Sequence, residues 1–376
     1  MPTSASTARR VGQFTRHLAP VEWEEVACPL CGSHSYSSLL AWHNEAGDFD
    51  RTADDERSEA DSDLLKVVQC GVCDLVFTNP RPTAETIGYY YPSDYSCYEI
   101  RSAVSNRWKA RLRARLQRVV LRTDFGYPSP RVTRLDRVYS RLGRAWLRGG
   151  LRRSEWIPYR GEGKLLDFGC GAGAFLERMR DLGWHVQGLD MSTVAAHAVM
   201  RHRGIKVHVG TLPHCDLAPE SFDCVTMWQA LEHVHDPRLT IREARRLLRP
   251  RGLLVVAVPN LASWSFRHFG RHWFGLDVPR HLTHFTPTTL NALLAAEGLR
   301  VLKLTQVGTD GWVRQSAHRL AAHGTQIASS GGTAQRNADG SQWLKACRWK
   351  PLAQAISAWS ERTAQADDMV VIAERG

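Results

Sequence analysis

The chain has 376 residues, of which 43% are apolar and 23% charged, so it is a globular protein with room for one large or two medium domains. No apolar run approaches the roughly 18 residues of a membrane-spanning helix, and the first residues lack the apolar core of a secretory signal. These features argue against an integral membrane or secreted protein, and we expect a cytoplasmic enzyme, with peripheral attachment to a membrane left open. The net charge of +11 is uneven: between Arg101 and Arg160 there are 17 Lys and Arg against three acidic residues.

Residues 1–23 read as a disordered leader, and residues 24–100 as a small cysteine-containing domain. This domain holds two C-x-x-C pairs with an acidic, loop-like stretch between them; the pairs are Cys28 with Cys31 and Cys70 with Cys73. Four thiolates are the number that a closed tetrahedral zinc site needs, and neither pair sits beside a βαβ pattern as a redox pair would. We expect a structural zinc ribbon that does no chemistry, with chance pairing of the cysteines as the alternative.

Residues 101–160 form the Arg-rich segment. Apolar residues recur in it at helical spacing, namely Trp108, Leu112, Leu116, Val119 and Val120. The segment reads either as a solvated helical linker or as a basic surface for an anionic partner. The candidate partners are a membrane surface, a lipid-phosphate carrier or, less favoured, a nucleic acid.

From residue 161 to 376 the pattern alternates between β-rich and helical runs. Strands are predicted at 164–169, 185–191, 206–210, 222–229, 253–260, 299–307 and 368–376. Helices are predicted at 174–183, 192–204, 237–252 and 286–298, with Thr286 or Thr288 as the N-cap of the last. Residues 309–366 are predicted to be a helical insert with a low-complexity loop between pieces at 312–323 and 342–360. The alternation predicts an α/β fold with a doubly wound, mostly parallel seven-stranded sheet.

A Gly-rich turn follows the first of these strands. Asp167, Gly169, Gly171 and Gly173 make a D-x-G-x-G-x-G pattern, in which glycine lets the backbone bend sharply and lets a ligand approach it. Asp190 ends the second strand about 20 residues later, where a carboxylate can accept both hydroxyls of a ribose. The glycines alone do not exclude a dinucleotide site, and a tight turn with a surface Asp is the structural alternative.

With these landmarks, residues 164–308 resemble the class I S-adenosylmethionine-dependent methyltransferases. The stretches FDCVTMWQALEHVHDP and LRPRGLLVVAVPN are similar to the fourth and fifth strands of that fold. The resemblance implies a cofactor site built of the turn (Asp167, Gly169, Cys170, Gly171, Gly173) for the methionine end, Asp190 and Met191 at the ribose, Thr211 and Leu212 by the adenine, and Trp228 and Gln229 beside the sulfonium.

The pair Glu232 and His233 lies in a turn similar to that of ubiquinone-type O-methyltransferases, in which acids and a His can bind a divalent cation. This chain has Gln229 where those enzymes have a carboxylate, and an amide is a weaker ligand for a hard cation. We therefore expect no catalytic metal here. The alternatives are that the two residues brace and cap the next helix or that they add polarity to an active site.

The stretch LDVPRHLTHFT places Asp277, Arg280, His281 and His284 after the fifth strand, on the side of the sheet where ligands bind. Methyl transfer to a hydroxyl requires removal of its proton, for which a neutral His is suited. Either His281 or His284 is the predicted base, with Asp277 to orient an imidazole and Arg280 to bind an acceptor anion. The alternative is that one His caps the following helix and the other packs in the loop.

The motifs CPLCG, CGVCDLVFTNPRP and YYYPSDY, followed by the methyltransferase-like region, are similar to bacterial zinc-ribbon methyltransferases of sugars, glycans and secondary metabolites. The resemblance implies an S-adenosylmethionine-dependent methyltransferase, and we expect O-methylation of a sugar or glycan precursor. RNA methylation through the basic segment and a non-catalytic adaptor on anionic surfaces are the alternatives.

Overall fold

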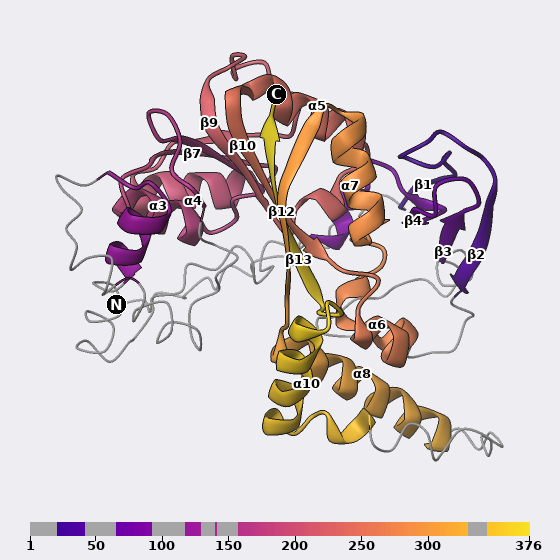
Figure 1. Ribbon diagram of the computed structural model, residues 1–376. Coiled ribbons are helices and arrows are strands. Elements are labelled where there is room, and N and C mark those ends of the chain that lie inside the picture. The colour runs from indigo at the N-terminus through magenta and orange to yellow at the C-terminus, as the bar shows by residue number, and fades with distance from the viewer. Residues whose placement is uncertain (1–20, 42–64, 92–116, 129–139, 141–156, 330–343) are drawn as a thin grey trace, which may run out of the picture.

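The computed structural model describes residues 21–41, 65–91, 117–128, 140, 157–329 and 344–376. Its main body is a twisted sheet between two layers of helices, with the N-terminal strands on one side and a helical pair below (Figure 1). No helix in the described ranges is long and apolar enough to cross a membrane.

The central sheet confirms the predicted doubly wound architecture. Its seven strands lie in the order β12-β13-β10-β9-β6-β7-β8. Their bounds are β6 Lys164–Phe168, β7 His185–Asp190, β8 Val207–Val209, β9 Phe222–Trp228, β10 Leu248–Pro259, β12 Leu299–Val307 and β13 Asp368–Arg375. The pairs among β8, β7, β6, β9 and β10 are parallel, and only β13 runs antiparallel to both of its neighbours.

The apolar residues of these strands alternate between the two faces of the sheet. Leu165 packs with α3 (Ala174–Asp181) and α4 (Thr193–Arg203), whereas Leu166 faces α5 (Pro237–Leu247) and α7 (Pro287–Ala296). Both side chains are fully buried. The two helical layers are visible on opposite sides of the sheet in Figure 1.

The start of α7 and the end of α5 can be compared with the helix ends predicted from the sequence. Helix α7 has Thr286 as its N-cap in a capping box with Thr289, which decides between the two predicted caps. Helix α5 ends at Leu247 rather than at the predicted Gly252, and β10 begins at the next residue. The physical reason is Pro250, since proline disfavours helical backbone in the residue before it.

The N-terminal domain has a two-stranded sheet of β1 and β5, and its other strands share a four-stranded sheet with the methyltransferase part. Its strands are β1 Trp23–Glu24, β2 Tyr36–Ala41, β3 Lys66–Cys70, β4 Val76–Thr78 and β5 Arg81–Pro82. The four-stranded sheet has the order β11-β4-β3-β2, and its first strand, β11 (Thr283–His284), comes from the predicted catalytic loop. The structure therefore joins the predicted ribbon to the methyltransferase part through a shared sheet.

The described part of the Arg-rich segment includes a helix at residues 117–124. Val120 and Leu121 are buried there, in the same apolar cluster as Tyr127, Ile157 and the inner faces of α3 and α4. This end of the segment is thus part of the methyltransferase core rather than a solvated linker. Most of the remaining residues to 156, with Trp108, Leu112 and Leu116, lie outside the described ranges.

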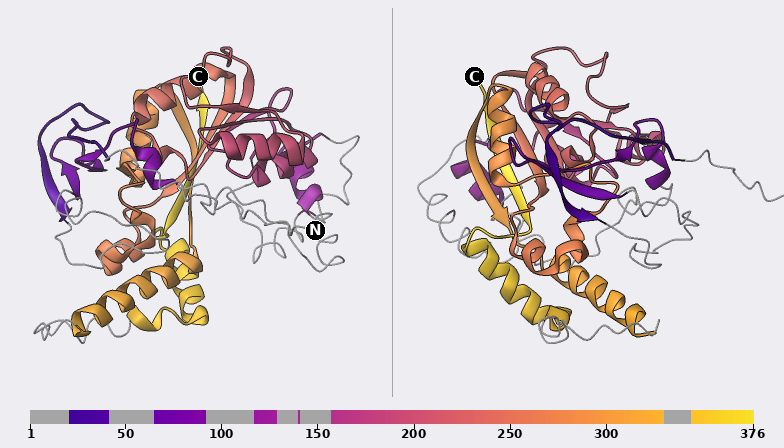
Figure 2. Two further views of the ribbon diagram at one scale, coloured as in Figure 1. Left: turned by 180° about the vertical axis from the view of Figure 1, so that it is seen from behind. Right: turned by 90° about the vertical axis from the view of Figure 1, so that its right-hand side faces the viewer.

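The predicted insert forms two long helices, α8 (Asp310–Ser329) and α10 (Lys350–Arg362), which pack against each other. They lie below the sheet beside α6 (Trp264–Phe269), as the two views of Figure 2 show. Most of the low-complexity stretch between them, 330–343, is outside the described ranges. Within the described residues, helices lie where the insert is predicted, and α8 contacts the short 3-10 helices η6 (Gly270–His272) and η7 (Phe274–Leu276), which precede the candidate loop.

Candidate active site

The Gly-rich turn connects β6 to α3 at the carboxyl edge of the sheet. Gly169, Gly171 and Gly173 all have left-handed backbone, with φ of 72°, 48° and 70°. A side chain at Gly169 would come within 2.8 Å of the Ala230 side chain, and one at Gly173 within 2.8 Å of Val199. Glycine is therefore required both by conformation and by the close approach of two neighbouring elements.

Asp190 fastens this turn to the next helix. One carboxylate oxygen accepts the Gly171 N–H at 2.8 Å and the other accepts the Ser192 N–H at 2.9 Å. Each oxygen keeps acceptor capacity, so the carboxylate can still take the two hydroxyls of a ribose. Burial raises the pKa of Asp190 above its ordinary value. The turn and this carboxylate fit the nucleoside and methionine parts of S-adenosylmethionine.

Asp167 and Cys170, two of the predicted cofactor residues, have buried side chains. Asp167 is 2% exposed and accepts a hydrogen bond of 2.6 Å from the Thr226 hydroxyl on β9. Burial raises the pKa of Asp167 to about 7 and raises the pKa of the Cys170 thiol. The structure thus gives Asp167 a role in holding the turn to β9, and its contact with a cofactor stays a prediction.

The remaining predicted cofactor residues surround the same edge. Met191 and Thr211 are exposed and Leu212 is buried, so an adenine there would meet a mixture of open and apolar surface. The Trp228 ring lies 5.1 Å from that of Phe175, and its indole N–H has no partner among the described residues. The Gln229 amide donates to the Asp368 carboxylate at 2.9 Å. These assignments stay predictions.

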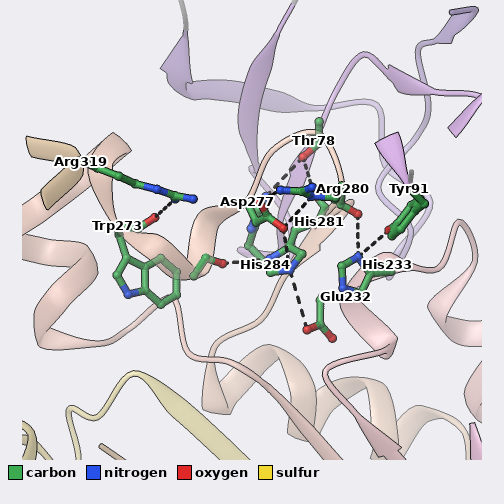
Figure 3. A network of polar contacts seen from close by, with 11 residues as sticks. Thr78, Tyr91, Glu232, His233, Trp273, Asp277, Arg280, His281, His284 and Arg319 are labelled. Carbon is green, nitrogen blue, oxygen red and sulfur yellow. Dashed lines mark hydrogen bonds and ion pairs between the residues drawn. The ribbon is translucent and has the colours of Figure 1, made fainter. Parts of the chain in front are cut away.

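The four polar residues of the predicted catalytic loop are brought together, but not in the predicted pairing (Figure 3). Arg280 donates two hydrogen bonds of 2.9 and 2.7 Å to the Asp277 carboxylate. Burial alone would raise the pKa of Asp277, but His281 and Arg280 beside it lower the pKa to about 2. An acceptor anion would therefore have to compete with Asp277 for Arg280.

His281 is oriented by the backbone rather than by the predicted carboxylate. Its Nδ1 is 2.9 Å from the Gly275 carbonyl oxygen, whereas its Nε2 is 3.9 Å from the nearest Asp277 oxygen, which is too long for a hydrogen bond. A carbonyl can only accept, so Nδ1 carries the proton and Nε2 is the basic nitrogen. Burial first, and then the neighbouring His233, hold the pKa of His281 well below its ordinary value.

His284 lies at the interface with the N-terminal strands. It belongs to β11, and its Nε2 is 3.3 Å from the Thr78 hydroxyl on β4. Burial lowers the pKa of His284 to about 3. Neither histidine caps the following helix, since Thr286 does, so the capping part of that alternative is wrong.

Glu232 and His233 lie in the short 3-10 helix η5 (Leu231–His233) and face the loop. The Nδ1 of His233 is 2.8 Å from the Tyr91 hydroxyl and 3.1 Å from the Arg280 carbonyl oxygen. Glu232 is 1% exposed, and neither oxygen of its carboxyl group has a hydrogen-bond partner among the described residues. The N-cap of α5 is Asp236, so these two residues do not cap that helix.

The carboxylate of Glu232 and the imidazoles of His233 and His281 form a polar cluster. Their ligand-type atoms lie within 4.8 Å of one another, which is a spacing that could hold a cation. Burial raises the pKa of Glu232 well above its ordinary value, which favours the neutral acid over the carboxylate that a cation needs. The cluster therefore suits a neutral polar ligand better than a hard cation.

The four predicted metal ligands also converge. Cys28 and Cys73 have their sulfurs 3.5 Å apart, as do Cys31 and Cys70, and all four sulfurs lie within 4.8 Å of one another. A tetrahedral zinc with Zn–S bonds of about 2.3 Å requires sulfurs a little under 4 Å apart. The arrangement fits a four-thiolate metal site.

Comparison with known proteins identifies the family. The family model of the methyltransferase domain matches residues 138–304. The ubiquinone biosynthesis O-methyltransferase of Xanthomonas euvesicatoria pv. vesicatoria is 30% identical over 175 residues, which are 43% of this chain and 73% of that enzyme. The chain belongs to the class I S-adenosylmethionine-dependent methyltransferases.

A second relative is the ubiquinone biosynthesis O-methyltransferase of Pseudomonas syringae pv. tomato. It is 32% identical over 164 residues, which are 40% of this methyltransferase and 71% of the relative. A solved S-adenosylmethionine-dependent methyltransferase from Archaeoglobus fulgidus matches this chain with a TM-score of 0.39 and 20% identity, over 62% of this chain and 94% of that one.

Three groups that contact the predicted site residues are not predicted from the sequence. Thr78 and Tyr91 come from the N-terminal strands and their surroundings, and the Gly275 carbonyl is a backbone group. Thr78 and Tyr91 lie inside the two stretches that carry the zinc-ribbon resemblance, CGVCDLVFTNPRP and YYYPSDY, which was the available signal. No sequence signal indicates which carbonyl oxygen will accept the hydrogen bond of the His281 imidazole.

Proposed function

We propose that this methyltransferase methylates a hydroxyl oxygen and that Nε2 of His281 takes the proton. The observation that carries the proposal is a buried carboxyl group without a hydrogen-bond partner beside the basic nitrogen of a histidine. Nε2 of His281 lies 4.0 Å from one oxygen of Glu232, whose carboxyl group has no partner among the described residues. A buried polar group without a partner is costly, so a ligand that supplies one is favoured.

The separation suits a bridging hydroxyl. An oxygen placed about 2.8 Å from each group fits between atoms that are 4.0 Å apart. It would donate its proton to Nε2 of His281 and accept a hydrogen bond from the protonated Glu232, whose pKa burial raises. The neutral acid would then stabilise the negative charge that develops on the acceptor oxygen.

S-adenosylmethionine, when bound, supplies an electrophilic methyl group. The residues of the chain have the task of placing the acceptor oxygen in line with it and holding the proton. Ala230, which touches the Gly-rich turn, is only two residues from Glu232, so the cofactor edge and the polar cluster adjoin. His281 is a better candidate for the base than His284, whose Nε2 already contacts Thr78.

For the acceptor we propose a hydroxyl of a sugar or glycan precursor, on the strength of the zinc-ribbon resemblance. The names of the relatives favour a second class, an intermediate of ubiquinone biosynthesis. Labelled-methyl transfer into a panel containing sugar nucleotides, lipid-linked sugars, hydroxylated ring compounds and RNA separates the classes of acceptor. We expect the label in an ether of a sugar hydroxyl. Label only in RNA, or in no acceptor while the chain still binds anionic surfaces, would favour the RNA or adaptor alternative instead.

Divalent cations provide a separate check on the polar cluster. We expect turnover to be unchanged when magnesium or manganese is added or omitted, because burial raises the pKa of Glu232 and so disfavours its carboxylate, and because the Gln229 amide is engaged by Asp368. Turnover that requires an added divalent cation would assign Glu232, His233 and His281 to a cation instead.

We further propose that the four cysteines hold one structural zinc ion. Metal analysis of the purified chain should find about one zinc per chain, and Cys70→Ser should lose it because the site needs all four thiolates. Cys215→Ser is the matched control, since Cys215 is an exposed cysteine outside the cluster. A wild-type chain with intact cysteines but no zinc would contradict the proposal.

The predicted anionic partner remains a proposal. The Arg-rich segment that would bind a membrane surface, a lipid-phosphate carrier or nucleic acid lies mostly outside the described residues. Its described helix is anchored in the methyltransferase core by Val120 and Leu121. Such a partner would therefore be held close to the domain that carries the cofactor site.

A further inference from the structure

We propose that the N-terminal ribbon is a built-in part of the acceptor side of the site, in which Thr78 is a positioning residue and the metal site keeps the catalytic loop in place. The proposal that the ribbon holds the loop in place does not depend on the proposed function. Only the expected effect on turnover rests on the proposed role of His281. The first observation is the shared sheet, in which β11 of the loop is hydrogen-bonded to β4 of the ribbon.

The register ties the loop closely to the metal ligands. His284 pairs with Val76, which is only three residues after Cys73, and Thr283 pairs with Phe77. The backbone N–H of Thr78 then donates to the Leu282 carbonyl at 3.0 Å. Any movement of the second cysteine knuckle is therefore transmitted along a few residues of strand to the loop.

The Thr78 side chain adds a contact to both predicted bases. Its hydroxyl is fully buried and donates to the His281 carbonyl oxygen at 2.8 Å. Since a hydroxyl has a single proton, its 3.3 Å contact with Nε2 of His284 requires that nitrogen to be the donor. Thr78 thus fixes the backbone of one histidine and the tautomer of the other (Figure 3).

Apolar packing and further hydrogen bonds join the same two parts. Phe285 and Phe77 are both 1% exposed and belong to one apolar cluster, which also includes Cys28 and Cys70. On the other side of the ribbon, the Arg81 guanidinium donates to the His235 carbonyl at 2.7 Å. The ribbon is therefore docked over a continuous buried interface rather than attached through one strand pair.

A second clamp reaches the first cysteine knuckle. Arg238 of α5 donates to the carbonyl of Leu30, the residue before Cys31, at 3.3 Å. The carboxylate of Glu297 holds the same guanidinium at 2.9 Å. Both knuckles are thus tied to the methyltransferase part, one through α5 and one through β11. Removal of the metal should release the knuckles and, with them, the loop.

Hydrogen–deuterium exchange of the full-length, zinc-loaded chain tests the role of Thr78. In Thr78→Val we expect the backbone amides of residues 281–284 to exchange about tenfold faster. The substitution removes the buried hydroxyl that contacts the His281 carbonyl oxygen and Nε2 of His284. Thr78→Ser keeps the hydroxyl and should restore the protection. Ser38→Ala, an exposed position on β2 of the same sheet, is the matched control. Unchanged exchange in Thr78→Val would overturn the assignment.

The metal arm of the experiment removes zinc with a chelator and confirms the loss by metal analysis. We expect at least a tenfold rise in exchange for residues 276–286 and no change in α4, which packs on the opposite face of the sheet from α5 and α7. Unchanged exchange in the loop, or an equal rise in α4, would overturn the coupling between the metal site and the loop.

Activity separates this inference from the proposed function. Calorimetry should show unchanged S-adenosylmethionine affinity in Thr78→Val, and turnover should fall by about tenfold as His281 loses its position. A loop that loosens without any loss of turnover would leave the coupling intact and would contradict the proposed role of His281.

Discussion

Asp190→Ala is expected to weaken binding of S-adenosylmethionine by at least about 100-fold. The carboxylate is predicted to hold the ribose hydroxyls, and a hydrogen bond to a charged group contributes about 1.5–3 kcal/mol. The substitution also removes the acceptor of the Gly171 and Ser192 N–H groups, so the turn loses its connection to α4. Calorimetric titration with S-adenosylmethionine measures the effect.

The control for this prediction is Asp181→Ala, which removes an exposed carboxylate at the end of α3. It should leave the affinity within a factor of two. Binding by Asp190→Ala within threefold of wild type would show that the ribose is held elsewhere. Burial raises the pKa of Asp190, so this carboxylate becomes protonated at a higher pH than an exposed Asp does. As the pH is lowered, the affinity of the wild-type chain for S-adenosylmethionine should therefore begin to fall earlier.

His281→Gln is expected to lower kcat by about 100-fold or more, which is the usual size of a lost general base. Glutamine keeps a polar side chain of similar length, so the loop should remain folded, and S-adenosylmethionine affinity should stay unchanged. The control is His318→Gln, an exposed histidine on α8. A kcat within twofold of wild type would eliminate His281 as the base.

The pH dependence of kcat gives a second test of the same residue. A base must be unprotonated, so it works above its own pKa, and the pKa of His281 is held well below 6.5 by burial and then by His233. We therefore expect kcat to stay level from pH 8 down past pH 6.5 and to fall only at lower pH. A fall centred at or above pH 6.5 would contradict this environment for His281.

The sequence by itself determined the methyltransferase part to a large extent. The alternation of strand and helix patterns, the Gly-rich turn and Asp190 at the end of the second strand are local signals, and each is tied to a backbone conformation or to a strand end. The cap of α7, predicted at Thr286 or Thr288, is a local signal of the same kind and lies at Thr286, and the four paired cysteines lie together. Helix α5 is shorter than its apolar pattern predicts because Pro250 disfavours helical backbone in the residue before it.

Only the tertiary structure decided how the candidate site is assembled. The pairing of β11 with β4 joins residues about 200 positions apart, and strand pairing at such a distance leaves no signal in either segment. The bond from His281 to the Gly275 carbonyl, the pairing of Arg280 with Asp277 and the burial of Glu232 depend equally on packing. Local patterns fix backbone conformation, but the partner of a buried polar group is chosen by whichever group the fold brings within hydrogen-bond distance.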